Sequence, residues 1–126
     1  MKKLIALCAI TLLAACSTFS TSNTIDTKTA ANRVYAAKVG HTGLLTAAVT
    51  YNNLARCTPT NRPVCSEQSV VDQLRKANTA AVATLDSAET VVRTPNVNQD
   101  VVEFTVLSAE NAVKAYQSIV KTYNIK

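Results

Sequence analysis

A repeat of apolar positions in residues 71–92 constrains the fold of this chain more than any other feature. With one polar exception, apolar residues recur at alternating steps of three and four over three heptads, at Val71, Leu74, Asn78, Ala81, Leu85, Ala88 and Val92. This spacing places them on one face of an α-helix. We expect Ser66 to cap the start of this helix, with Glu67 in its first turn. Thr94 should end the helix, because the residue before a proline is pushed out of the α region.

Residues 28–55 carry a similar pattern. Their inward positions are Val34, Ala37, His41, Leu44, Ala48, Tyr51 and Ala55. Gly40 and Gly43 lie in the middle of this predicted helix, where each costs about 1 kcal/mol relative to Ala. The same two glycines would also allow another helix to approach closely beside His41.

A third helix is predicted from about residue 98 to Tyr123. Asn98 is expected to cap it, Asp100 lies near the positive end of its dipole, and Val97 and Val102 have the spacing of a hydrophobic staple. The inward positions of this helix are Val102, Val106, Ala109, Val113, Tyr116, Val120 and Tyr123, with Leu107, Ala112 and Ile119 alongside.

The three segments together predict an all-α fold. No segment alternates apolar and polar residues with a period of two, so no strand is expected. Helices of about 26–28 residues would each be about 40 Å long at 1.5 Å per residue. Because short connections join them, we predict an up-down-up antiparallel three-helix bundle over residues 28–126. Leu85 should lie in its core and Asn111 on its surface.

The N-terminus has the pattern of an export signal. Met1-Lys2-Lys3 is followed by residues 4–15, which carry no charge. This run is shorter than the ~20 apolar residues that a helix needs to span a bilayer core. A basic start, a short apolar run and small residues are typical of a secretory signal. The alternative is that residues 4–15 form a buried terminal helix and that Cys16 is an ordinary thiol.

Residues Leu13-Ala14-Ala15-Cys16 resemble the lipobox of bacterial lipoproteins, and the resemblance covers only the N-terminal sixteen or so residues. It implies that residues 1–15 are a signal peptide and that Cys16 carries a thioether-linked diacylglyceride, usually with a further acyl chain such as palmitate on its amine. In enteric bacteria an Asp after the cysteine tends to hold lipoproteins at the inner membrane, and this chain has Ser17. The resemblance therefore implies the outer membrane, facing the periplasm, with residues 16–27 as a hydroxyl-rich flexible tether.

The charge balance does not favour nucleic acid as a partner. Removal of residues 1–15 takes away Lys2 and Lys3 and leaves 11 basic against 8 acidic residues, a net charge of +3 instead of +5. No run of Lys or Arg longer than Arg75-Lys76 remains. We therefore expect no nucleic-acid binding.

Cys57 and Cys65 remain after Cys8 is assigned to the signal and Cys16 to the lipid. In an oxidising periplasm they are expected to form a disulfide in the connection between the first and second helices. Closing this short loop would add about 2.6 kcal/mol to the free energy of unfolding, because it reduces the entropy of the unfolded chain. Two thiols and a single histidine, His41, are too few for a zinc site, so we expect no metal or cofactor.

An anchor at Cys16 would give the bundle a direction. The connection between the first two helices would lie far from the membrane, together with the end of the third helix. Arg56 and Arg62 lie in or beside that connection, and Lys121 and Lys126 close the third helix. These residues predict a basic surface for an acidic envelope component or protein. The alternative is that the cations only favour the helix dipoles and stay solvated.

Catalysis has little support. Asp86 and Glu89, at i and i+3, are interpreted as a solvated face. His41 has an inward phase, and a reactive role would need a partner such as Ser108 or Glu110 from another helix. A hydrogen-bonded buried histidine is the simpler interpretation.

The sequence therefore predicts a non-enzymatic, lipid-anchored protein of the bacterial envelope that acts as a structural or interaction module. Its anchoring partner would be the membrane. Two alternatives remain: a small-ligand binder or inhibitor that uses the helix interior near His41, and a phage-borne envelope lipoprotein.

Overall fold

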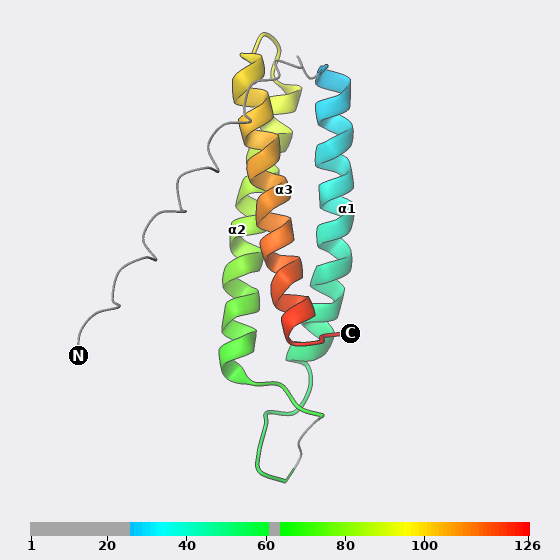
Figure 1. Cartoon of the computed structure of the whole chain (residues 1–126), viewed down its shortest axis with the longest axis vertical. Coiled ribbons are helices and arrows are strands. Elements are labelled where there is room, and N and C mark those ends of the chain that lie inside the picture. The colour runs from blue at the N-terminus through cyan, green and yellow to red at the C-terminus, as the bar shows by residue number, and fades with distance from the viewer. Residues whose placement is uncertain (1–25, 61–63) are drawn as a thin grey trace, which may run out of the picture.

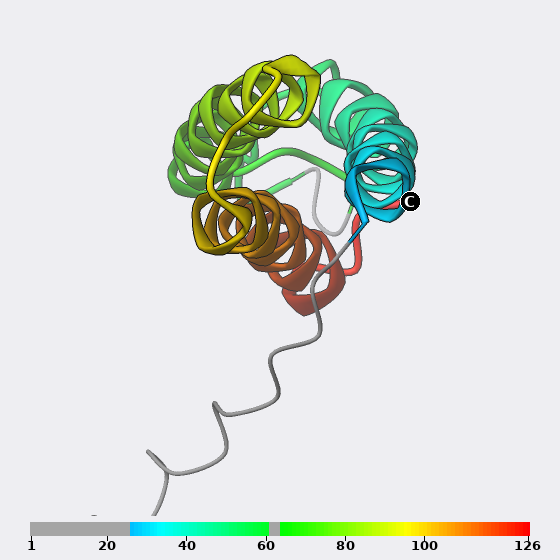
Figure 2. The same cartoon turned by 90° about the horizontal axis from the view of Figure 1, so that it is seen from above.

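The computed structural model describes residues 26–60 and 64–126, and this part of the chain folds as the predicted three-helix bundle. The helices are α1 (Thr27–Asn52), α2 (Gln68–Arg93) and α3 (Gln99–Thr122). Successive helices run in opposite directions, and each helix packs against both others (Figure 1 and Figure 2). Within the described residues there is no strand.

The core consists of two apolar clusters along the bundle. The cluster near the start of α1 contains the buried residues Ala30, Val34, Leu85, Ala88, Val102, Val106 and Ala109. The cluster near the end of α1 contains Ala48, Val70, Leu74, Tyr116, Val120 and Ile125. Most of these are predicted inward positions, which confirms that the apolar repeat in each segment marks its buried face. Small residues such as Ala30 and Ala88 allow the helices to pack closely.

The turn between α2 and α3 follows the local signals in the sequence. Thr94 is extended, with φ −83° and ψ 124°, as expected for a residue before proline. Asn96 has a φ of 61°, a left-handed conformation that asparagine tolerates better than most residues. The Asn98 side chain accepts a hydrogen bond of 2.8 Å from the Asp100 backbone N–H and caps α3 as predicted. Val97 packs against the cluster that contains Val102.

α1 is less well covered than the other two helices. It packs less extensively against α2 and α3 than these two pack against each other. The glycines do not provide the predicted close approach of a second helix, because Gly40 and Gly43 are exposed and a Cβ atom at either would meet nothing within 4 Å. That expectation was wrong because both glycines lie on the side of α1 that faces away from the bundle.

Candidate functional site

One end of the bundle, which we call the tip, contains residues 53–60 and 64–67 between α1 and α2 and residues 121–126, which include the last two residues of α3. The start of α1 and the α2–α3 turn lie at the opposite end (Figure 1). The antiparallel order of the helices therefore brings the disulfide loop and the end of α3 together, as predicted from the sequence.

The base of the loop at the tip is held by covalent and hydrogen bonds. Cys57 and Cys65 form the predicted disulfide, with their Cα atoms 4.9 Å apart. Beside it, the Cys57 N–H donates to the Ser66 carbonyl (3.1 Å) and the Ser66 N–H donates to the Ala55 carbonyl (2.9 Å). These bonds join the chain before and after the loop. They also explain why α1 ends at Asn52 and does not reach Ala55 as predicted.

Ser66 ties the loop to the end of α1 and does not cap α2. Its side chain is fully buried, and its hydroxyl donates to the Leu54 carbonyl (3.0 Å) and accepts a hydrogen bond from Arg56 Nη1 (2.7 Å). Glu67 occupies the N-cap position and so is not in the first turn of α2, and its backbone N–H donates to the Tyr51 hydroxyl (2.9 Å). The predicted cap was therefore wrong. Arg56 has a structural role in addition to its charge.

The end of α3 folds back over the tip. Asn124 has a φ of 48°, and the Ile125 N–H donates to the Val120 carbonyl (2.9 Å) while the Asn124 N–H donates to the Lys121 carbonyl (3.1 Å). This pair of bonds is a Schellman motif, in which a left-handed residue terminates a helix. The turn buries Ile125 in the same cluster as Val120. Tyr123, predicted to point inward, is the C-cap residue and is 41% exposed.

These elements surround a pocket of about 490 Å³ at the tip, which is open to solvent. It is lined by Thr50, Tyr51, Leu54, Val64, Cys65, Tyr123, Asn124, Ile125 and Lys126. Val64 is 72% exposed at its edge. Lys121 is exposed in the last turn of α3. The tip pocket therefore combines apolar and tyrosine surface with nearby positive charge. Arg62, the remaining predicted tip residue, lies outside the described residues.

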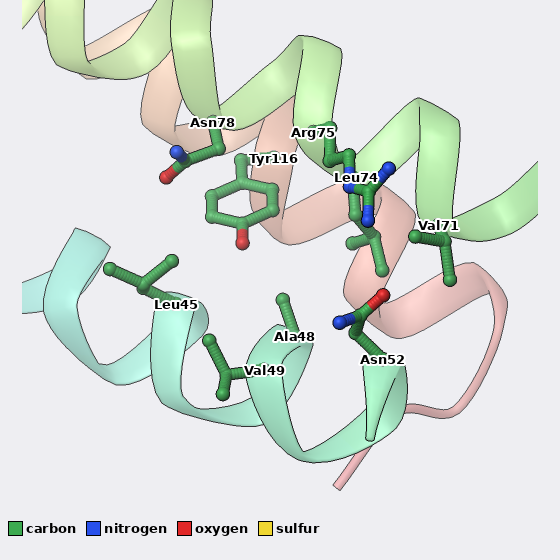
Figure 3. Close-up of a pocket in the computed structure, with 9 residues that line it drawn as sticks. All are labelled: Leu45, Ala48, Val49, Asn52, Val71, Leu74, Arg75, Asn78 and Tyr116. Carbon is green, nitrogen blue, oxygen red and sulfur yellow. The ribbon is translucent and has the colours of Figure 1, made fainter. Parts of the chain in front are cut away.

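A second concavity of about 140 Å³ lies between α1 and α2. Its walls are Leu45, Ala48, Val49 and Asn52 from α1 and Val71, Leu74, Arg75 and Asn78 from α2. Tyr116 of α3 forms its floor, and the Tyr116 hydroxyl points between the two helices (Figure 3). Burial raises the pKa of this tyrosine above its ordinary value.

His41 lies close to this pocket as a hydrogen-bonded core residue. It is 7% exposed, and its Nε2 atom is 2.9 Å from Asn78 Oδ1. Because a carbonyl oxygen only accepts, this contact places the proton on Nε2. The ring also lies 5.7 Å from that of Tyr116, at 42° between planes. Ser108 and Glu110, the partners considered from the sequence, are engaged elsewhere: Ser108 donates to the Phe104 carbonyl and Glu110 pairs with Arg33.

Two ion pairs connect α1 to its neighbours. Arg33 donates to both carboxylate oxygens of Glu110 on α3, at 2.8 and 2.9 Å. The hydrogen bond from Arg33 holds the pKa of Glu110 below its ordinary value. Glu89 on α2 pairs with Lys38 of α1 and with Arg93 of its own helix, and the bond from Lys38 lowers the pKa of Glu89. Glu89 therefore forms an inter-helix ion pair, while Asp86 beside it is exposed.

Comparison with known proteins identifies no relative: no family model, no curated protein and no solved structure matches this chain. Among the described residues, no three His, Cys, Asp or Glu side chains group as metal ligands. None of the helices in residues 27–122 is long and apolar enough to cross a membrane. Cys16, the predicted lipidation site, lies outside the described residues.

Sequence reasoning missed the structural use of Arg56, Ser66 and Tyr51, and it missed the α1–α2 pocket. The loop contacts join residues 10 to 16 positions apart through side chains, so no local sequence pattern predicts them. A signal for incomplete packing beside α1 was present, since Leu45 and Val49 are large apolar residues next to the predicted inward positions.

Proposed function

We propose that this protein is a non-enzymatic lipoprotein of the bacterial envelope that presents the tip of its bundle to an acidic partner. The observation that carries the proposal is the position of the tip relative to the start of α1. The chain enters α1 at Thr27 at one end of the bundle, and the tip lies at the other (Figure 1). A 26-residue helix is about 39 Å long. An anchor at Cys16, eleven positions before the start of α1 at Thr27, would leave the tip directed away from the lipid.

The construction of the tip suits a binding surface. The disulfide, the Arg56–Ser66 contact and the Schellman motif each fix one part of it, so less conformational entropy is lost when a partner binds. Tyr51 and Tyr123 supply large side chains at the tip pocket, and Lys121 and Lys126 supply positive charge beside it. This combination favours a partner that offers carboxylates together with some apolar surface, such as a protein patch or peptidoglycan carboxylates.

The anchor is tested by metabolic labelling with palmitate and by the intact mass of the mature protein. We expect label on the wild-type chain and a mature protein that begins at Cys16. Cys16→Ser should lose the label. A mature chain that starts elsewhere, or that carries no acyl mass, would contradict the anchor.

The tip is tested by capture of cross-linked partners from whole envelopes. Lys121→Glu combined with Lys126→Glu should reduce partner recovery at least tenfold, because the favourable charge becomes repulsive towards an acidic partner. The matched control is Lys76→Glu combined with Lys114→Glu, which changes the net charge equally at exposed positions outside the tip. Arg56 is left intact because its replacement would loosen the loop. Equal recovery from the tip and control variants would remove the tip from the proposal.

The structure gives the small-ligand alternative less support. The α1–α2 pocket includes Asn78 and Tyr116, the two contacts of His41, but neither His41 nor the glycines line it. Its volume of about 140 Å³ is below the roughly 300–1,000 Å³ of typical ligand sites.

A further inference from the structure

The outer face of α1 carries apolar side chains and little charge. From Val39 to Ala55 the chain contains 17 consecutive residues without Asp, Glu, Lys or Arg. Tyr35, Val39 and Val49 are 72%, 55% and 50% exposed. The other two helices carry exposed charged residues along their length, at Asp72, Arg75, Lys76, Asp86, Arg93, Asp100, Lys114 and Lys121. Exposed apolar surface of this kind is typical of an interaction site.

The exposed positions on α1 have the spacing of a helix-packing seam. Tyr35, Val39, Thr42, Thr46 and Val49 follow one another at steps of four, three, four and three, as the residues between two packed helices do. We call these five residues the α1 seam. The hydroxyls of Thr42 and Thr46 donate to the backbone carbonyls four residues earlier, at 3.0 and 3.1 Å. Because these hydroxyls already have hydrogen bonds, burying them would cost little.

The α1 seam continues into the α1–α2 pocket, because Val49 belongs to both and Leu45 lies between them (Figure 3). The pocket walls come from positions i, i+3, i+4 and i+7 of each helix, starting at Leu45 on α1 and at Val71 on α2. Its volume of about 140 Å³ is close to the roughly 150 Å³ of an engineered cavity that accepts benzene. One apolar side chain from a helix lying along α1 would therefore fit.

We propose that the α1 seam binds a second copy of this chain, with the two α1 helices parallel and side by side. In a parallel pair with two-fold symmetry each residue meets its own counterpart, so any charge on the shared face would meet a like charge. Residues 39–55 avoid this repulsion, and Lys38 beside them is paired with Glu89. The parallel direction rests on the proposed anchor, which would hold both copies by the same end.

The size of the seam indicates that the contact is weak in free solution. Residues 35–49 form about 22 Å of helix, and at a helix width of about 10 Å they offer on the order of 200 Å² per copy. A stable dimer usually buries about 800 Å² per partner. Confinement to one membrane raises the effective concentration of the second copy and favours such a contact. The dimer should therefore form on membranes and dissociate in dilute solution.

Disulfide cross-linking of the full chain in isolated envelopes tests the pairing. Thr42→Cys and Thr46→Cys should each give a covalent dimer on mild oxidation, since identical positions face each other. Asn111→Cys, exposed on α3, is the matched control and should give at least tenfold less. Equal cross-linking of seam and control positions would overturn the proposal. If Val39→Cys links only to Val49→Cys in mixed samples and never to itself, the helices are antiparallel and the parallel pair is overturned.

A second tether allows the α1 pair to be tested whether or not Cys16 is lipidated. The full chain, with Cys8 and Cys16 replaced by Ser and a hexahistidine tag before Met1, is bound to vesicles that contain a nickel-chelating lipid. Cross-linking of Thr42→Cys on these vesicles supports the α1 pair even if palmitate labelling fails. Its absence there overturns the pair even if labelling succeeds.

Charge placed on the seam provides an independent test. Thr46→Lys should reduce the cross-linking of Thr42→Cys at least tenfold, whereas Asn111→Lys should not change it. Thr46 and Asn111 are both exposed, so circular dichroism should show the same fold and a similar Tm for both variants. Undiminished cross-linking in the Thr46→Lys variant would overturn the seam as the contact.

Discussion

The contact between His41 and Asn78 joins two polar side chains beside the apolar core, where His41 is 7% exposed. Asn78→Leu should lower the free energy of unfolding by about 1–3 kcal/mol, because His41 then keeps a buried N–H without its partner. Replacing both residues by leucine should cost much less than the sum of the single changes. Urea unfolding of the two single variants and the double variant measures this coupling. Additive effects of the two single changes would show that His41 and Asn78 do not stabilise each other.

Leu85 tests the packing of the apolar core. It is 2% exposed and belongs to the cluster near the start of α1. Leu85→Ala should lower the free energy of unfolding by about 2–5 kcal/mol, because it removes buried surface and leaves a cavity. Asn111→Ala, at an exposed position, should change it by less than about 0.5 kcal/mol. Similar midpoints in urea for the two variants would contradict this core.

At the residue scale, the sequence predicted that His41 points inward but not what it contacts. Helical periodicity gives the angular position of a side chain around the axis of its helix. The choice of Asn78 over Ser108 or Glu110 depends on the axial offset between helices, which periodicity does not contain.

Among the elements, α1 is the one whose sequence is least suited to a helix. Gly40→Ala and Gly43→Ala should each raise the free energy of unfolding by about 0.5–1 kcal/mol, since alanine restricts the unfolded chain and the added methyl meets no neighbour within 4 Å. The urea midpoint should rise with an unchanged slope. A loss of stability would mean that the outer side of α1 is covered at these positions.

The ends of the elements were harder to predict than their middles. Asn98 caps α3 as expected because its bond to the Asp100 N–H is local. Ser66 has the same capping chemistry, but the disulfide holds it beside Leu54 and Arg56, where its hydroxyl is used. Tyr123 was expected to point inward but is 41% exposed, and Ile125 is buried, because Asn124 turns the chain after α3. For Ser66, contacts within the disulfide-closed loop thus override the local preference of serine for the N-cap position.

In the whole molecule, acid should loosen the attachment of α1. Glu110 and Glu89 have pKa values below the ordinary 4.5 because of Arg33 and Lys38. A lowered pKa in the folded state gives stability that is present above pH 4.5 and lost as the pH falls below it, since the unfolded chain then binds more protons. We expect the free energy of unfolding to fall over this range in urea titrations at successive pH values.

Glu110→Gln separates this effect from general acid unfolding. The substitution should lower the free energy of unfolding by at most about 1 kcal/mol at pH 7, because the pair is partly solvated. Below pH 4.5 the free energy of unfolding should then fall less steeply with decreasing pH than in the wild type. Asp86→Asn removes one exposed carboxylate on α2 and serves as the matched comparison for the loss of one negative charge. Equal slopes for the wild type and Glu110→Gln would contradict a role for this ion pair.

The sequence by itself determined that this protein has three helices, which face of each is buried, and that Cys57 and Cys65 are close enough to pair. Periodicity, caps and short loops are local properties of the chain, so they can be recognised before the fold is known. Only the tertiary structure decided that Ser66 and Arg56 hold the tip together, that a pocket opens beside Tyr116, and that α2 and α3 leave the α1 seam exposed. The first depends on a loop that the disulfide closes, and the other two depend on how three helices of unequal amphipathicity divide their apolar surface among themselves, which no single segment specifies.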